Sequence, residues 1–296
     1  MRDENRAVTF FTVPRAFEGR TGIAQRNAIG SWLRTNPGSQ VILFGDDPGV
    51  AEAARELGAD HVAQVDRAES GTPLLADVFR RAHEKARNPI LAYANSDIIF
   101  LSDLARTLAP IDEALPEQFL VIGRRTELPV SGLVDFAVAD WEQQLLGTAA
   151  RQGELASRVC KDYFIFPKSL YTNIPPFAVG RGNWDNWMVY HAHETGIPVV
   201  DASEAITAIH QSHGYAHVAG GRRGADITGV EAKRNRDLGG GSHVVRGSAT
   251  NWRLTRSGLR RVLFPTASLQ LVADGYRFVK LLIEFFLLNW RKRSEQ

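Results

Sequence analysis

The chain has 296 residues, of which 44% are hydrophobic and 23% are charged. This composition is typical of a globular protein and excludes wholesale disorder, collagen and coiled coil. The formal net charge of +2 is too small to indicate nucleic-acid binding by the chain as a whole. Cys160 is the only cysteine, which excludes an internal disulfide and a cysteine-based zinc site. The first residues are charged and lack the apolar run of a signal peptide, so we expect a cytoplasmic protein.

The first hundred residues alternate between two hydrophobic periods. Short apolar runs rich in β-branched and aromatic residues predict buried strands, and stripes at helical spacing predict the helices between them. Thr72 and Pro73 are typical of an N-cap and a first helical position. Alternation at this spacing predicts βαβ units, with a parallel sheet covered by helices on both faces. The expected elements are strand 7–13, a helix from about Ala24 to Asn36, strand 41–44, helix 50–57, strand 61–65, a helix from Pro73 to Asn88 and strand 90–94.

The second half is less regular, which favours a mixed sheet over a second wound repeat. Residues 219–247 are rich in glycine and basic residues, so we expect a mobile loop there. The expected elements are strands 119–123, 163–166, 199–200 and 205–209, and a helix over 185–195 closed by Gly196.

Basic residues gather towards the C-terminus. Residues 252–293 contain nine lysines or arginines against two acidic residues, a net charge of +7. The run 278–290 is strongly apolar, but it is too short and too often charged to span a bilayer. We therefore expect a globular domain over residues 1–250 and a basic amphipathic helical tail over residues 251–296. The tail either lies on the inner face of the plasma membrane, packs on the domain, or contacts the partner of a homodimer.

Polar residues follow three of the predicted strands. In open α/β sheets ligands bind beyond the carboxyl ends of the strands. Thr12 and Pro14 end the first strand, Asp46 follows the second, and Asn95, Ser96 and Asp97 follow the strand 90–94. Asp97 lies between two apolar runs, where a carboxylate needs a cation or several hydrogen bonds. It either binds a metal or caps the following turn through backbone N–H groups.

This arrangement resembles the nucleotide-diphospho-sugar glycosyltransferases of GT-A fold, of the bacterial family-2 type. The resemblance implies a Rossmann-like, mostly parallel mixed sheet flanked by helices. In that family a short Asp-x-Asp motif holds a divalent cation against the donor diphosphate. Here the motif is Asn95-Ser96-Asp97, with an amide in place of the first carboxylate. The resemblance makes Asp97 the ligand of Mn²⁺ or Mg²⁺ and gives Asn95, with Ser96, a hydrogen-bonding role towards the donor.

The same resemblance covers further residues. It implies that Thr12, Pro14 and Asp46 cradle the nucleotide base. Several GT-A families complete the metal shell with a late histidine, which makes His210, at the end of the strand 205–209, the first choice and His213 the second. The alternative is a histidine satisfied by backbone hydrogen bonds.

The segment 222–236 combines glycine hinges with basic residues. A flexible basic segment is suited to folding over a diphosphate and excluding water, since cations stabilise a leaving group that gains negative charge. The alternative is an ordinary solvated loop. The basic residues concerned are Arg222, Arg223, Lys233, Arg234 and Arg236.

Residues 180–187 form the densest polar and aromatic cluster. In inverting GT-A enzymes a carboxylate in this region is the general base on the acceptor hydroxyl, so the resemblance suggests Asp185 for that role. Trp184 and Trp187 offer faces that stack on sugar rings, and Asp162, before a strand, is a further candidate for the acceptor side. The alternative makes Asp185 an N-cap and places both tryptophans in the core.

The sequence therefore predicts transfer of a sugar from a nucleotide-diphosphate donor to a hydroxyl on a glycan or lipid-linked acceptor, in cell-surface polysaccharide or glycolipid synthesis. One alternative is a sugar-1-phosphate nucleotidyltransferase. That enzyme needs a glycine-rich basic loop after the first strand, and Pro14–Arg20 contains one glycine. Another alternative is a module that binds glycans or nucleotides without turnover.

Overall fold

The computed structural model describes residues 7–115, 117–158, 160–211, 228–241 and 250–262. Its centre is a nine-stranded sheet with the order β13-β12-β10-β6-β9-β4-β1-β2-β3. The strands of this sheet are β1 Val8–Thr12, β2 Gln40–Phe44, β3 Asp60–Val62, β4 Ile90–Ala94, β6 Leu120–Ile122, β9 Tyr163–Pro167, β10 Val199–Asp201, β12 Trp252–Thr255 and β13 Gly258–Arg261.

Most strands of this sheet run in parallel, which confirms the predicted α/β class and mixed sheet. β4, β1, β2 and β3 form one parallel block, and β6, β10 and β12 form another. β9 is antiparallel to both of its neighbours, β4 and β6. Because Ala94 at the end of β4 pairs with Tyr163 at the start of β9, the residues after β4 and those before β9 meet at one edge of the sheet.

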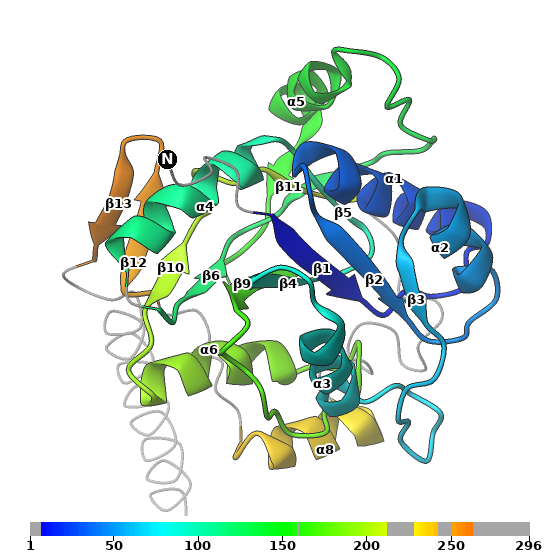
Figure 1. The fold of residues 1–296 in the computed structure, drawn as a ribbon, viewed down its shortest axis with the longest axis vertical. Helices are drawn as coiled ribbons and strands as arrows, with labels where there is room; N and C mark the ends of the chain where they lie inside the picture. The colour runs from blue at the N-terminus through cyan, green and yellow to red at the C-terminus, as the bar shows by residue number, and fades with distance from the viewer. Residues whose placement is uncertain (1–6, 116, 159, 212–227, 242–249, 263–296) are drawn as a thin grey trace, which may run out of the picture.

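Helices cover both faces of the sheet, as expected for βαβ units (Figure 1). One buried apolar cluster joins one face of the sheet to three helices, α1 Gly19–Thr35, α2 Val50–Leu57 and α4 Asp103–Ala114. A second cluster joins the other face to α3 Leu75–Lys85 and α6 Trp184–Glu194. The helix α8, Val230–Leu238, lies beside α3 and α6 on this second side (Figure 1).

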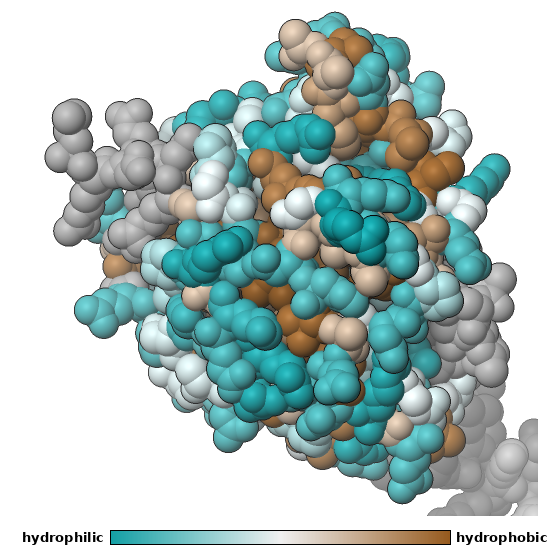
Figure 2. Space-filling model, turned by 45° about the vertical axis from the view of Figure 1, so that its right-hand side comes forward, coloured by the Kyte–Doolittle hydropathy of each residue, from teal (hydrophilic) through white to brown (hydrophobic). Residues whose placement is uncertain are grey.

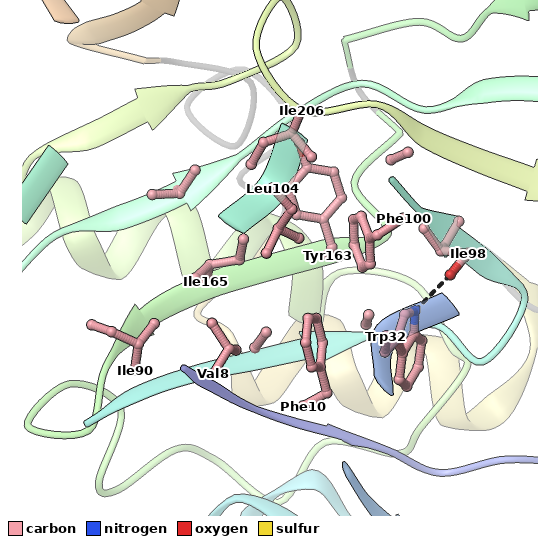
Figure 3. Packing of buried hydrophobic residues seen from close by; sticks show 14 of the residues in the cluster. Val8, Phe10, Trp32, Ile90, Ile98, Phe100, Leu104, Tyr163, Ile165 and Ile206 are labelled. Atoms are coloured by element: carbon pink, nitrogen blue, oxygen red, sulfur yellow. Dashed lines mark hydrogen bonds between the residues drawn. The ribbon is translucent and has the colours of Figure 1, made fainter. Parts of the chain in front are cut away.

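Aromatic packing fixes α1 on the sheet. The Trp32 ring stacks on Phe10 of β1, with centroids 5.4 Å apart, and the indole Nε1 donates a hydrogen bond of 2.8 Å to the Ile98 carbonyl (Figure 3). Trp32 is fully buried, so its one polar atom needs this partner. The bond ties α1 to the segment that directly follows Asp97.

A second, four-stranded sheet has the order β5-β11-β7-β8. The helix α5, Trp141–Gln152, packs beside it and projects from the body of the molecule (Figure 1). Hydrophobic side chains gather on this projection (Figure 2). Leu133, in the segment before α5, is 65% exposed, and Leu146 of α5 and Leu155 of β8 are also exposed. The strands of the small sheet are β5 Ile98–Phe100, β7 Thr126–Leu128, β8 Glu154–Leu155 and β11 Ala208–Gln211.

Two local predictions were wrong, the start of the helix at Pro73 and the extent of the strand 61–65. α3 begins at Leu75, and Thr72 and Pro73 lie in an extended segment before it. Pro73 pairs with Arg67 and Leu74 with Ala178 as isolated bridges. Residues 73 and 74 therefore pair with distant parts of the chain through their backbone, and this extended pairing is incompatible with a helix that begins at Pro73. The third strand is also shorter than predicted, covering Asp60–Val62.

The predicted loop over residues 219–247 was wrong for its central part, which forms α8. The fully buried side chain of Asn235 explains why a helix is stable there. Its Oδ1 accepts a 2.8 Å hydrogen bond from the Ala178 N–H, and its Nδ2 donates one of 3.0 Å to the Ala178 carbonyl. The helix is thereby fixed to the body of the protein, while the glycines flank it.

The division proposed at residue 250 does not coincide with the end of the sheet. β12 pairs in parallel with β10, and β13 pairs with β12, so residues 252–261 extend the main sheet. The apolar run 278–290 lies outside the described residues, and the three locations considered for it stay predictions. Among the helices of the described segments, none is both long and apolar enough to cross a membrane.

Candidate functional site

The segment after β4 is the centre of a connected set of polar side chains. Asp97 lies beside His210, with 3.5 Å between Asp97 Oδ2 and His210 Nε2. His210 belongs to β11, which pairs antiparallel with β5 so that His210 stands opposite Ile98. The antiparallel pairing of two short strands therefore brings together the two residues predicted as metal ligands.

Glu127 holds the other side of the imidazole. β7 and β11 pair in parallel with His210 opposite Glu127, and His210 Nδ1 lies 2.5 Å from Glu127 Oε2. A carboxylate at Nδ1 fixes the tautomer and orientation of a ligating histidine and leaves Nε2 to bind a metal. Here Nε2 is the atom that faces Asp97.

Arg125 and Asp162 continue the chain of contacts. Arg125 binds Glu127 at 2.6 Å and Asp162 Oδ1 at 2.5 Å. Asp162 Oδ1 also accepts a 2.9 Å hydrogen bond from Asn95 Nδ2, and Asp97 lies two positions after Asn95. These contacts, together with the backbone from Asn95 to Asp97, form a closed set that we call the charged ring. Its members are Asn95, Asp97, Arg125, Glu127, Asp162 and His210.

The charged ring carries an excess of negative charge. Its members include three carboxylates and one guanidinium, which gives a formal charge of −2 while His210 is neutral. Burial lowers the pKa of His210, but the hydrogen bond and charge of Asp97 outweigh it and raise that pKa above its ordinary value. Burial raises the pKa of Glu127, but His210 and Arg125 outweigh it and lower that pKa. The ring therefore favours positive charge at the place where Asp97 and His210 meet.

The donor atoms at this place fit a divalent cation as a two-ligand site. Adjacent ligand atoms of one octahedral Mg²⁺ ion lie about 3 Å apart, close to the 3.5 Å separation of Asp97 Oδ2 and His210 Nε2. Within the described residues, no group of three or more His, Cys, Asp or Glu side chains could hold a metal ion. Further ligands would come from a substrate phosphate, from water, or from residues outside the described segments.

The loop after β1 is fixed to the same centre by Gln25 of α1. The buried Gln25 side chain accepts a 2.8 Å hydrogen bond from the Arg15 N–H and donates one of 2.9 Å to the Arg15 carbonyl. Its Oε1 also accepts a 2.9 Å hydrogen bond from Ser96 Oγ. Gln25 therefore holds Pro14 and Arg15 in a set position relative to Ser96.

The remaining donor-side candidates lie at the ends of β1 and β2. Thr12 is the last residue of β1, and its buried Oγ1 makes no hydrogen bond within the described segments. Asp46, after β2, is 67% exposed at the rim and forms an ion pair with Arg67. This pair joins the β2 end to the loop that follows β3.

Asp185 lies in the first turn of α6. Lys161 Nζ lies 3.7 Å from Asp185 Oδ2 and donates a 3.0 Å hydrogen bond to Asn186 Oδ1. Burial raises the pKa of Asp185, and Lys161 opposes that rise. The N-cap of α6 is Asn183, in a left-handed conformation with φ 82°, so the alternative that made Asp185 the N-cap was wrong.

Both tryptophan rings pack against other aromatic rings of the protein. Trp184 is 7% exposed and packs on Tyr93 and Phe164, each with ring centroids 5.2 Å away. Trp187 is half-buried and stacks on His191 at 4.7 Å. Trp184 thus belongs to the core, which corrects the prediction that it stacks on an acceptor sugar.

The predicted basic lid is described only in part. Lys233 is exposed on α8, and Arg234 donates a 2.8 Å hydrogen bond to the Pro176 carbonyl. Glu231, at the start of α8, binds Arg181 at 2.7 Å and Ser70. Lys233 therefore stands on an anchored helix, which corrects the prediction of a mobile loop at this position. Arg222, Arg223 and His213 lie outside the described residues.

Sequence reasoning missed four polar residues of the site: Gln25, Arg125, Glu127 and Lys161. Two of them had a detectable signal, because Arg125 and Lys161 lie two positions from the predicted strands 119–123 and 163–166. Glu127 lies four positions after the strand 119–123 and had no such signal. Gln25 had none, since it lies inside an ordinary helical stripe.

Comparison of the sequence with protein-family models and with curated proteins found no match. Among solved structures, glucosyl-3-phosphoglycerate synthase from Mycobacterium tuberculosis, in complex with Mg²⁺ and UDP, is 16% identical with a TM-score of 0.41, over 70% of this chain and 72% of that one. The mannosyltransferase PcManGT from Pyrobaculum calidifontis, in complex with GDP-Man and Mn²⁺, is 13% identical with a TM-score of 0.44, over 71% and 58%. Mannosyl-3-phosphoglycerate synthase from Rubrobacter xylanophilus is 16% identical with a TM-score of 0.42, over 71% and 67%. The solved structures that match this chain thus include glycosyltransferases of GT-A fold, at low identity.

Proposed function

We propose that this protein transfers a sugar from a nucleotide-diphosphate donor to a hydroxyl group of an acceptor. The observation that carries the proposal is the charged ring, with its excess negative charge and with Asp97 and His210 side by side. A group of this charge at the carboxyl end of β4 is suited to a divalent cation that a diphosphate also binds.

Asp97 and His210 would hold Mn²⁺ or Mg²⁺. When bound, such an ion stabilises the negative charge that the leaving nucleoside diphosphate gains as the glycosidic bond breaks. Glu127 keeps His210 Nε2 directed at Asp97, and Arg125 offsets part of the charge of Glu127 and Asp162.

The donor nucleotide would bind across the ends of β1, β2 and β4. Thr12 and Pro14 form the floor, and Asp46 at the rim contacts the base or ribose after release from Arg67. Ser96, held by Gln25, sets the approach of the diphosphate to Asp97. Lys233 and the arginines 222 and 223 are proposed to contribute positive charge near the diphosphate.

Asp185 would act as the general base. Its first-turn position on α6 and its contact with Lys161 place it near the start of β9, beside Asp162. A carboxylate there takes the proton of the acceptor hydroxyl as the new bond forms. Asp162 is bound to Arg125 and Asn95, so we assign it to ordering the charged ring and not to direct acceptor contact.

The acceptor is proposed to be a glycan or a lipid-linked sugar, in cell-surface polysaccharide or glycolipid synthesis on the cytoplasmic side. The test incubates the protein with labelled UDP-, GDP- and dTDP-sugars, Mn²⁺ and a panel of such acceptors. Release of nucleoside diphosphate and labelled product supports the proposal, provided that Asp97→Ala abolishes both. Pyrophosphate release from a nucleoside triphosphate would instead support a nucleotidyltransferase. Saturable binding without product would support a binding module.

A further inference from the structure

In the part of the chain that the structure describes, Lys161 is almost completely buried next to a carboxylate of the proposed site. The Lys161 side chain is 1% exposed. Its Nζ lies 3.0 Å from Asn186 Oδ1 and 3.7 Å from Asp185 Oδ2. Burying an ammonium group is strongly unfavourable unless charge and hydrogen bonds compensate it. Lys161 therefore has a physical reason to remain beside Asp185.

The two partners come from different elements. Lys161 precedes β9, whose first residue pairs with the last residue of β4. Asp185 and Asn186 lie in the first turn of α6, after the left-handed Asn183. The contact therefore fixes the start of α6 relative to the edge of the sheet where the charged ring lies.

We propose that Lys161 is a positioning residue, which keeps the Asp185 carboxylate ionised and directed towards the acceptor. This inference rests on the proposed function, in which Asp185 is the general base. A general base has to be ionised at the working pH, and burial opposes ionisation of a carboxyl group. Lys161 supplies the compensating positive charge, and its hydrogen bond to Asn186 holds the first turn of α6.

The electrostatics around Asp185 agree with this role. Among the described residues, Lys161 and Asp162 are the charged groups with the largest influence on the pKa of Asp185. Asp162 opposes ionisation of Asp185, but its own charge is offset by Arg125 at 2.5 Å. Burial raises the pKa of Asp185, and Lys161 is the largest influence that lowers it. Without Lys161 a smaller fraction of Asp185 would be ionised at neutral pH.

The experiment measures the pKa of Asp185 directly, by NMR titration of protein labelled with ¹³C at aspartate carboxyl groups. Asp185→Asn identifies the resonance. In Lys161→Met, which keeps most of the volume and removes the charge, we expect the pKa of Asp185 to rise by about 1–3 units. Lys168→Met is the matched control, because Lys168, at the other end of β9, donates to the Ala86 carbonyl. An unchanged Asp185 pKa in Lys161→Met would overturn the proposal.

A second variant keeps the test available if Lys161→Met does not fold. Lys161→Gln also removes the positive charge and leaves a hydrogen-bonding group near Asn186 and Asp185. We expect the Asp185 pKa to rise in Lys161→Gln as in Lys161→Met, and an unchanged Asp185 pKa in this variant would also overturn the proposal. Both titrations use protein without substrate. The two proposals can therefore fail separately. If the protein transfers no sugar but the Asp185 pKa still depends on Lys161, the proposed function is wrong and the coupling between the two residues remains.

Once an acceptor is known, the pH profile gives a further readout. In Lys161→Met the acidic limb of kcat/KM should move to higher pH by the same amount as the Asp185 pKa, while Lys161→Arg should move it less. A lower kcat/KM with an unmoved acidic limb would show that Lys161 only supports the fold.

Discussion

His210 and Glu127 face each other across the neighbouring parallel strands β11 and β7, with 2.5 Å between His210 Nδ1 and Glu127 Oε2. The opposite ring atom, Nε2, faces Asp97. A carboxylate–imidazole pair of this kind orients the imidazole and raises its basicity as a ligand. In the proposed cation site Glu127 would act indirectly, because it holds the imidazole on the side opposite Asp97.

Glu127→Gln should therefore weaken Mn²⁺ binding without removing the ligands. The amide can still contact the imidazole but no longer fixes the tautomer through charge, so we expect the Kd for Mn²⁺ to rise about 10- to 100-fold. Calorimetry or electron paramagnetic resonance of the free ion measures it. Glu154→Gln is the matched control, because Glu154 stands opposite Glu127 on β8 and is exposed. Equal affinities in Glu127→Gln and the unmodified protein would contradict this role.

A second prediction concerns the amide in the Asn95-Ser96-Asp97 motif. Asn95→Asp would create the two-carboxylate motif of the GT-A family, yet we expect it to lower stability and not to improve cation binding. Asn95 Nδ2 donates to Asp162 Oδ1, and a carboxylate at position 95 would replace that hydrogen bond with repulsion. The expected loss is about 1–3 kcal/mol in the free energy of unfolding.

A double-mutant cycle tests this explanation. Asp162→Asn supplies an amide opposite the new carboxylate, so the Asn95→Asp/Asp162→Asn pair should lose less stability than the two single changes add up to. Urea unfolding at neutral pH measures all four proteins. Additive losses would show that Asn95 and Asp162 are not coupled.

Local sequence signals predicted the first half of the fold well. Helix 50–57 has the predicted bounds, because Gly58 takes the left-handed conformation, with φ 76°, that ends a helix. The start of α3 was wrong, because the bridge between Leu74 and Ala178 depends on residues about a hundred positions apart, which local propensity does not record. For the same reason α8 was missed, since its stability depends on Asn235 reaching Ala178.

The sequence allowed several residues of the candidate site to be predicted individually, but not the contacts between them. Strand ends pointed to Asp97 and His210, and the structure brings them together. The register of β5 with β11 makes that contact, and no local pattern contains it. The roles of Arg125 and Lys161 depend on which carboxylates they meet in the folded chain. Trp184 was wrongly predicted to contact the acceptor, because an aromatic residue beside a polar loop is equally suited to the core, where Trp184 lies.

Asn235 is expected to be the main anchor of α8. Asn235→Ala would leave the buried N–H and carbonyl of Ala178 without their partner, at a cost of about 1–3 kcal/mol. Hydrogen exchange should show faster opening of α8, and the free energy of unfolding should fall. Asp237→Ala, an exposed position on the same helix, is the control and should change neither. Unchanged protection of α8 in Asn235→Ala would contradict the anchor.

The last prediction concerns acid stability and Asp77 of α3. Burial raises the pKa of Asp77, but the Asp66 N–H, Arg81 and Arg80 outweigh it and lower that pKa below its ordinary 3.8. The side chain is nearly buried, with 2.9 Å to the Asp66 N–H and 2.7 Å to Arg81. Because the folded pKa lies below the unfolded one, this stabilisation is present above about pH 4 and disappears as the pH falls through the folded pKa.

Asp77→Asn should therefore cost stability at neutral pH, by about 1–3 kcal/mol, and progressively less as the solution becomes acidic. Urea unfolding at a series of pH values from 7 downwards measures the difference between the two proteins. Glu84→Gln is the control, because Glu84 is exposed and pairs with Arg80 on the surface of the same helix. If the stability cost of Asp77→Asn stays constant down to the lowest pH, the charge of Asp77 does not contribute to stability. Its side chain would then stabilise the fold only through packing and neutral hydrogen bonds.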